Sequence, residues 1–174
     1  RTAADIENWE GSQAIPVPKS TLLIMADRLR RADPGKTFVD DAKGGGATDL
    51  EMAELVQAWS ERLRVAGVVR GDVVPVALDR GTPLVAVMLA TLFLGASFAP
   101  LDPLAPEERL RRVLEILEAR VGVAGSGVGL PQVATQWLTS PSENVEMKGF
   151  FDGIERPAPD QVAFVLFTSG STGK

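Results

Sequence analysis

The chain of 174 residues ends in the stretch that decides its fold, Val162-Ala163-Phe164-Val165-Leu166-Phe167-Thr168-Ser169-Gly170-Ser171-Thr172-Gly173-Lys174. The part from Val162 to Phe167 is an unbroken apolar run, long enough for a strand and too short for a helix. Such a run is typical of a central strand that is covered on both faces. The sequence therefore predicts a buried parallel strand that leads directly into a loop of hydroxyl and glycine residues.

The residues after this strand suit a loop that binds phosphate. A parallel strand delivers the loop that follows it to the carboxyl edge of its sheet, where α/β proteins bind ligands. Hydroxyls and an ammonium donate hydrogen bonds to phosphate oxygens, and glycines permit backbone turns that point amides at an anion. The order differs from a Walker loop, which needs Gly at position 168 and Ser or Thr after the lysine. The alternative interpretation is a solvated Ser/Gly linker.

Helix and strand patterns alternate along the preceding chain. Thr48 and Glu51 have the spacing of a capping box at the start of a helix. Pro75 removes a donor from its strand, which predicts an edge strand or a bulge. Alternation at these spacings predicts an α/β fold with a largely parallel sheet flanked by helices. The expected helices are residues 21–30, 48–66, 82–94 and 106–117, and the expected strands are 38–39, 73–78, 98–99, 121–124 and 162–167.

The helix expected from Thr82 has an apolar surface all round. Thr82 and Pro83 are typical of a helix start, with a hydroxyl cap and a proline in the first turn. Residues 84–94 are apolar on every side, which predicts a buried helix. At about 1.5 Å per residue this helix would cover roughly half of a bilayer core. We therefore expect a helix inside a soluble fold, with no membrane partner and a cytoplasmic location.

Composition excludes several kinds of chemistry. Apolar residues make up 45% of the chain and charged residues 24%, the profile of a globular domain or part of one. The net charge of −5 argues against a nucleic-acid partner. The chain has no Cys, His or Tyr, which excludes disulfides, Cys/His zinc sites, thiol nucleophiles and histidine bases within it. No catalytic residue and no metal site are identified.

Other conspicuous residues have ordinary structural interpretations. The glycine-rich residues 122–129 lack the dinucleotide-binding spacing and predict a flexible turn. Asp79-Arg80 is expected as a surface pair between a strand and a helix, and Asp102-Pro103 as a cap or turn. A solvated helix face is expected to carry Glu107, Glu108, Arg109, Arg111 and Arg112. The core or the linker is expected to be anchored by Trp9, Trp59 and Trp137.

Three stretches, in order, resemble motifs of adenylate-forming enzymes, in particular the adenylation domains of nonribosomal peptide synthetases. Residues 162–173 resemble the phosphate-loop motif, residues 92–103 the second core motif and residues 48–55 the first. The chain departs from the family where an aromatic residue usually stands near Leu50, and at Pro75. Lys174 matches a variable position, and the motif lysine of the family is not equated with it.

The resemblance implies a ligase that activates an amino, hydroxy or aryl acid with ATP and Mg²⁺ as an acyl-adenylate. The acyl group would then pass to the phosphopantetheine thiol of a carrier domain. The resemblance places no catalytic residue in this chain, since the catalytic lysine and the substrate pocket of the family lie downstream. An acyl-CoA synthetase of the same superfamily and a non-catalytic α/β binding module are the alternatives. The residues expected to hold the β- and γ-phosphates are Thr168, Ser169, Gly170, Ser171, Thr172 and Gly173.

The resemblance also implies a division of the chain and a set of partners. Residues 1–20 are expected to be a linker or strap that follows an upstream condensation domain. Residues 21–174 are expected to be the N-terminal portion of an adenylation core, incomplete at its C-terminal end. The chain has no initiator Met, so we expect a piece of a longer synthetase. Its partners would be the rest of the adenylation domain, a peptidyl carrier domain, a condensation domain and an amino-acid-like substrate.

Overall fold

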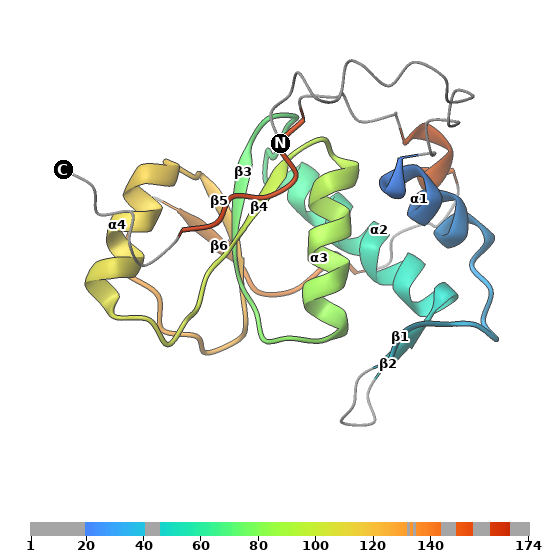
Figure 1. Cartoon of the computed structure of the whole chain (residues 1–174), viewed down its shortest axis with the longest axis horizontal. Coiled ribbons are helices and arrows are strands. Elements are labelled where there is room, and N and C mark those ends of the chain that lie inside the picture. The colour runs from blue at the N-terminus through green and yellow to red at the C-terminus, as the bar shows by residue number, and fades with distance from the viewer. Residues whose placement is uncertain are drawn as a thin grey trace, which may run out of the picture.

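The computed structural model describes most of the chain, from Ser20 onward (Figure 1). The expected N-terminal linker, apart from Ser20, and the expected phosphate-binding residues Thr168–Gly173 lie outside the described residues. No helix in the described part is long and apolar enough to cross a membrane. The residues described are 20–40, 46–131, 133, 135–143, 149–154 and 161–167.

The first half of the chain forms two helices around a small antiparallel sheet. Thr37 pairs with Thr48 across this sheet. The capping box is confirmed, because the Glu51 amide donates to Thr48 Oγ1 at 3.3 Å and the Thr48 amide donates to Glu51 Oε2 at 2.8 Å. The elements are α1 (Thr21–Arg31), β1 (Thr37–Asp40), β2 (Gly46–Thr48) and α2 (Asp49–Val65).

The second half forms a parallel sheet of the order β4-β3-β5-β6, which confirms the expected α/β fold class. Short connections and two helices join its strands, and a 3-10 helix follows the last one. The elements are β3 (Val73–Ala77), α3 (Thr82–Phe93), β4 (Ser97–Pro100), α4 (Glu107–Leu117), β5 (Val121–Ala124), β6 (Gln136–Leu138) and η2 (Phe150–Gly153).

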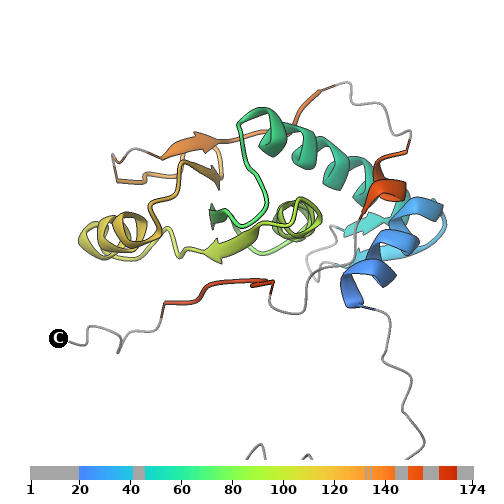
Figure 2. The ribbon, with the colours of Figure 1, turned by 90° about the horizontal axis from the view of Figure 1, so that it is seen from above.

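Helices cover the sheet on both faces, with α4 on one side and α2 and α3 on the other (Figure 2). Successive side chains of a strand point to opposite faces. Val74 and Val76 of β3 accordingly belong to the large core with α2 and α3. Ala77 belongs to a smaller core beneath α4, with Leu110 and Leu114. The sheet therefore lies between two layers of helices.

The edge position predicted from Pro75 is wrong, since β3 lies between β4 and β5. The carbonyl of Val76 accepts from Leu101 on the β4 side, and that of Ala77 accepts from Gly125 on the β5 side. Because backbone groups alternate along a strand, Pro75 is directed toward β5. The pairing with β5 begins only at Val76. The missing donor of Pro75 therefore interrupts no ladder, and a central strand tolerates it.

Helix α3 differs from its expectation in two respects. Its N-cap is Gly81, with φ 148°, and no side chain caps the helix, so the hydroxyl cap predicted at Thr82 is wrong. Only one face of the helix is fully buried, through Ala86, Val87 and Ala90. The other apolar side chains, such as Leu89, remain partly exposed. The helix is therefore half-buried, because α2 and the sheet cover only one side of it.

Candidate functional site

The carboxyl ends of the parallel strands meet along one edge of the sheet. Strands β3, β4 and β5 run in the same direction, and residues 161–167 run parallel to β4 beside it. Ligands of open α/β sheets bind at this edge. Residues 161–167 run toward the same edge, and the predicted phosphate-binding residues follow them directly in the sequence.

Residues 161–167 are held beside β4 by its backbone and by one serine. The amide of Phe98 donates to the carbonyl of Ala163 at 3.2 Å, and the amide of Val165 donates to the carbonyl of Phe98 at 3.0 Å. Ser97 Oγ donates to the carbonyl of Val162 at 2.6 Å. The rings of Phe98 and Phe164 lie 5.9 Å apart. Residues of the second motif therefore hold the described start of the third motif beside β4.

The prediction that this segment is covered on both faces is wrong. Val162, Phe164 and Leu166 are 55%, 53% and 62% exposed. The segment makes a single parallel bridge, between Phe98 and Phe164, instead of a regular strand. The backbone–backbone hydrogen bonds between this segment and the sheet are made with Phe98 of β4. The apolar side chains of this segment therefore lie largely on the surface instead of between two covering layers.

Phe167 is the last described residue before the predicted loop, and it contacts both the small core beneath α4 and a side chain of that helix. Its side chain packs against the small core that contains Leu110 and Leu114 of α4. Its carbonyl oxygen accepts a hydrogen bond from Arg109 Nη2 at 3.4 Å. Arg109 is exposed, as expected for a solvated helix face, but the sequence did not predict that its guanidinium contacts Phe167. No local sequence pattern indicates this contact, because the two residues are 58 positions apart.

The other residues expected at the turns of this edge have structural roles. Asp102 Oδ1 accepts from the amide of Leu104 at 3.0 Å, which confirms the turn expected at Asp102-Pro103. Asp79 and Arg80 are exposed between β3 and α3, as expected. The carbonyl of Gly125 accepts from the amide of Val128, and Gly127 has φ 78°, so a turn forms at residues 125–128. The turn expected over 122–129 is wrong for residues 122–124, which belong to β5.

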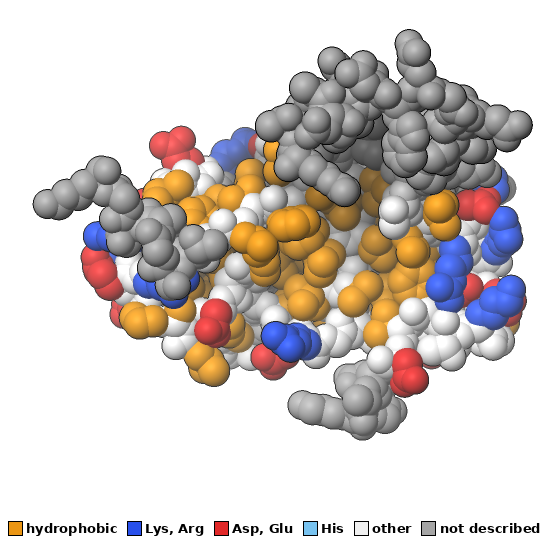
Figure 3. Space-filling model, in the orientation of Figure 1, with side chains coloured by type: hydrophobic (Ala, Val, Ile, Leu, Met, Phe, Trp, Pro, Cys, Tyr) orange, Lys and Arg blue, Asp and Glu red, His pale blue; other side chains and the backbone are white. Residues whose placement is uncertain are grey.

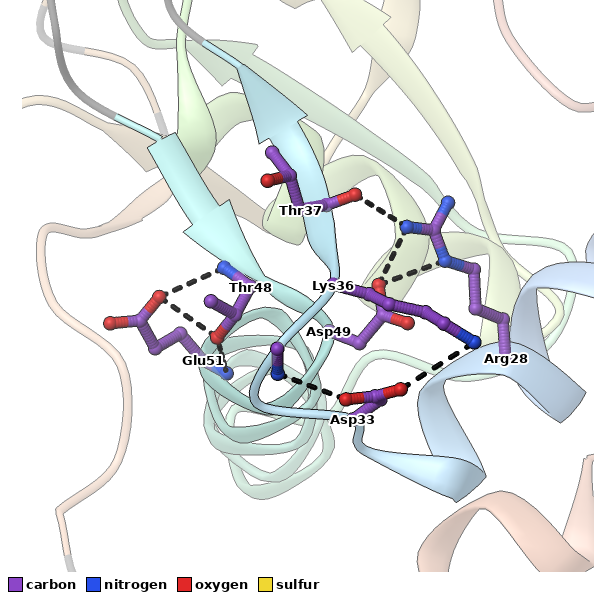
Figure 4. Close-up of polar contacts among 8 residues, drawn as sticks. Arg28, Asp33, Lys36, Thr37, Thr48, Asp49 and Glu51 are labelled. Atoms are coloured by element: carbon purple, nitrogen blue, oxygen red, sulfur yellow. Dashed lines mark hydrogen bonds and ion pairs between the residues drawn. The ribbon is translucent and has the colours of Figure 1, made fainter.

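A polar cluster joins α1 to the first motif, residues 48–55 (Figure 4). It is far in sequence from residues 161–167, which lead to the carboxyl edge. Arg28 reaches from α1 to Asp49, with Nε donating to Oδ1 at 2.8 Å, and its Nη2 donates to the carbonyl of Thr37 at 2.6 Å. The guanidinium carbon lies 4.6 Å from the centre of the Phe38 ring. Asp49 is almost completely buried, with 2% of its side chain exposed. These contacts satisfy the buried carboxylate and identify the cluster as structural.

Carboxylates with perturbed pKa values lie in capping interactions or surface ion pairs. Hydrogen bonds from the Thr48 amide and hydroxyl hold the pKa of Glu51 below its usual value of 4.5. The Gly35 amide, followed by Lys36, lowers the pKa of Asp33. The Arg64 guanidinium lowers the pKa of Glu61. None of these groups belongs to the carboxyl edge, so their pKa values report on folding rather than on a reaction.

Two hollows on the described surface lack the groups that a nucleotide would need. One of about 300 Å³ lies between α1, α3 and the segment at Gln161 and is mostly apolar. The other, of about 250 Å³, lies at the amino edge of the sheet, where Arg120 is 3.3 Å from Asp72. No group of three or more acidic or histidine side chains that could hold a metal ion occurs in the described part of the chain. The carboxyl edge remains the candidate site.

Comparison with known proteins identifies the family. Residues 27–174 match the family described as AMP-binding enzymes. The chain therefore belongs to the family of AMP-binding enzymes. Within this family it corresponds to an N-terminal part of the adenylation domain of a nonribosomal peptide synthetase, which confirms the resemblance seen in its motifs.

Similar curated proteins are large fungal synthetases. The chain is 33% identical over 183 residues to the nonribosomal peptide synthetase fmqA of Aspergillus fumigatus, an alignment that includes 100% of the chain and 4% of that protein. It is 36% identical over 110 residues to the N-benzoylphenylalaninol synthetase apmA of Penicillium brevicompactum, covering 62% of the chain and 5% of that protein. The chain thus spans only a small part of the length of these relatives.

Solved structures with the same fold include adenylation subdomains. The N-terminal subdomain of Klebsiella oxytoca NpsA in complex with 3-hydroxybenzoyl-AMSN matches with a TM-score of 0.70 and 23% identity, over 94% of this chain and 41% of that chain. The nonribosomal peptide synthetase FmoA3 in its alpha-methyl-L-serine-AMP-bound form matches with a TM-score of 0.67 and 26% identity, over 88% and 17% of the two chains.

Proposed function

We propose that the complete protein activates an amino, hydroxy or aryl acid with ATP as an acyl-adenylate and then passes the acyl group to the phosphopantetheine thiol of a carrier domain, with release of AMP. The observation that carries this proposal is the direction of residues 161–167. They run beside β4 to the carboxyl edge of the sheet and lead into Thr168. The family match supplies the chemical class.

The predicted loop would hold the leaving group of this reaction. Attack of a carboxylate oxygen on the α-phosphorus forms a new P–O bond and breaks the bond from that phosphorus to the oxygen that bridges to the β-phosphate, so pyrophosphate leaves. Hydroxyls and backbone amides near the β- and γ-phosphates would orient that group and stabilise its charge. In the proposal, Thr168, Ser169, Ser171 and Thr172 donate hydrogen bonds, and Gly170 and Gly173 allow the backbone to approach the phosphates.

No group of three or more carboxylates that could hold a metal ion occurs among the described residues. Mg²⁺ is usually held by one or two carboxylates together with substrate phosphates. In the proposal, the carboxylates that would hold Mg²⁺ lie downstream, as the family resemblance implies. The catalytic lysine and the acid-binding pocket are likewise expected outside this chain, which would therefore not catalyse the reaction alone.

Carrier and condensation domains of the same synthetase are the proposed partners. The curated relatives include nonribosomal peptide synthetases of which this chain spans only a few per cent, such as 4% of fmqA, and one similar structure is an artificially fused adenylation-PCP di-domain, NpsA-ThdA. These relatives favour peptide synthesis over the acyl-CoA synthetase alternative. The match to an enzyme family also counts against a non-catalytic binding module. A cytoplasmic location stays a prediction.

Exchange of labelled pyrophosphate into ATP tests the proposal on the complete protein. We expect exchange that depends on one amino, hydroxy or aryl acid when such acids are supplied in separate reactions. Thr172→Ala should raise the KM for ATP roughly tenfold through loss of a hydrogen bond to a charged group. Thr21→Ala, at the exposed start of α1, is the matched control. Exchange only with long-chain fatty acids, or none with any acid, would contradict the proposal.

A further inference from the structure

The contacts of Phe167 show how the last described residue before the predicted loop is fixed in place. Upstream of it, the bonds from Ser97, Phe98 and Val165 hold the segment along β4. At Phe167 the support changes from β4 to α4. The side chain packs in the core under α4, and the carbonyl accepts from Arg109.

Arg109 is well placed to restrain this point because its own position is fixed. The turn at Asp102 directs the chain from β4 into α4, with the amides of Leu104 and Ala105 bonded to Asp102. The amide of Arg109 donates to the carbonyl of Pro106 at 2.9 Å, in the first turn of the helix. Leu110, the next residue, is buried beneath the helix. The guanidinium therefore extends from a rigid base toward Phe167.

We infer that Arg109 is a positioning residue for nucleotide binding, which holds the peptide unit at Phe167 so that the following loop starts at a fixed place. This inference rests on the proposed function. It assigns Arg109 no contact with the nucleotide. A bond of 3.4 Å from an exposed guanidinium is modest. Because the loop would have to match the phosphates within a fraction of an ångström, modest restraint at its base should affect affinity for ATP.

The first test measures the restraint without any nucleotide. In Arg109→Ala, amide hydrogen exchange in a peptide covering residues 161–174 should be faster than in the wild-type chain. Arg112→Ala removes the same charge from an exposed position of the same helix and is the matched control. Equal exchange rates in the wild type and Arg109→Ala would overturn the inference, whatever the activity of the complete protein.

The second test separates positioning from general stability. In the complete protein, Arg109→Ala should raise the KM for ATP in pyrophosphate exchange about fivefold, with the KM for the acid and the melting temperature without ATP unchanged. Arg109→Lys, which keeps a donor, should recover part of the loss. An ATP KM within twofold of the Arg112→Ala value would overturn the inference while leaving the proposed function intact. Absence of exchange in the wild type would overturn both.

Discussion

Asp49 is a carboxylate whose side chain is 2% exposed, and Arg28 is its cationic partner. Arg28 also donates to the carbonyl of Thr37 and lies over the ring of Phe38. A buried charge whose partner is removed keeps its desolvation cost without compensation. Removal of Arg28 should therefore destabilise the chain by more than the net attraction of the intact pair stabilises it.

Arg28→Ala should lower the free energy of unfolding by about 2–3 kcal/mol, because Asp49 would stay buried without its partner. Urea denaturation of the chain measures this. Arg30→Ala is the control, since its pair with Asp27 is exposed to solvent and should contribute little. Equal losses in the two variants would show that Asp49 does not depend on Arg28.

Gly122 lies in β5 beneath the indole of Trp137. A Cβ atom at this position would stand 2.5 Å from Trp137 Cζ3 and 3.0 Å from Pro75 Cγ. Gly122→Ala should therefore destabilise the chain by about 1–3 kcal/mol through overpacking. Gly129→Ala, where a Cβ meets no atom within 4 Å, should leave stability nearly unchanged. Thermal denaturation of both variants decides, and a neutral Gly122→Ala would mean that Trp137 moves without cost.

At the scale of elements, the start of α2 depends on a reciprocal cap. Thr48 Oγ1 accepts from the Glu51 amide, and the Glu51 carboxylate accepts from the Thr48 amide and hydroxyl. Thr48→Ala should cost about 1 kcal/mol of stability, since an amide in the first turn loses its acceptor. Thr48→Ser keeps the hydroxyl and should recover most of it in the same urea titration. A Thr48→Ser variant as unstable as Thr48→Ala would assign the loss to the methyl group instead.

The same cap predicts a pH dependence with a definite sign. The pKa of Glu51 is lower in the folded chain than its usual value of 4.5 because Thr48 donates to the charged form. The resulting stabilisation is fully present above about pH 4.5 and is lost as the pH falls through the folded pKa. The wild type should therefore exceed Glu51→Gln in stability at neutral pH, and the difference should shrink on acidification. A difference that stayed constant down to about pH 3 would contradict a lowered pKa.

Local sequence patterns predicted most helices and strands. The errors concern features that depend on contacts between residues distant in sequence. The capping box, the apolar stripe of α4 and the turn at Asp102 depend on residues close together in sequence, and the structure confirms them. The position of β3 depends on which neighbours it pairs with, and the pattern around Pro75 does not contain that information. Burial of residues 161–167 likewise depends on distant chain. The contact of Arg109 with Phe167 spans 58 positions and has no local signature.

At the scale of the whole molecule, the two faces of the sheet differ in how completely they are covered. One face packs on α2 and α3 in a large core, and the other packs on α4 alone. The carboxyl edge lies where these layers end, beside the segment that leads to the predicted loop. The sequence motifs predicted this edge and its ligand class, whereas the geometry of Thr168–Gly173 stays a prediction.

Apolar side chains gather across the middle of one face of the molecule, over α3 and residues 161–167 (Figure 3). Val162, Phe164 and Leu166 contribute the exposed large residues of that segment. Contiguous apolar surface favours association between copies of a chain. The isolated chain should therefore associate weakly as its concentration rises, and replacing Val162 and Leu166 by Ser should reduce this association with little loss of stability.

A matched pair of substitutions elsewhere tests whether position matters or only the number of exposed apolar residues. Val65 and Val69 are 64% and 57% exposed but lie at the end of α2 and in the loop that follows. Changing both to Ser removes a similar apolar area away from α3, so association measured by sedimentation velocity should persist. If both double variants reduced association equally, general surface hydrophobicity would be its cause and the face over α3 would have no special role.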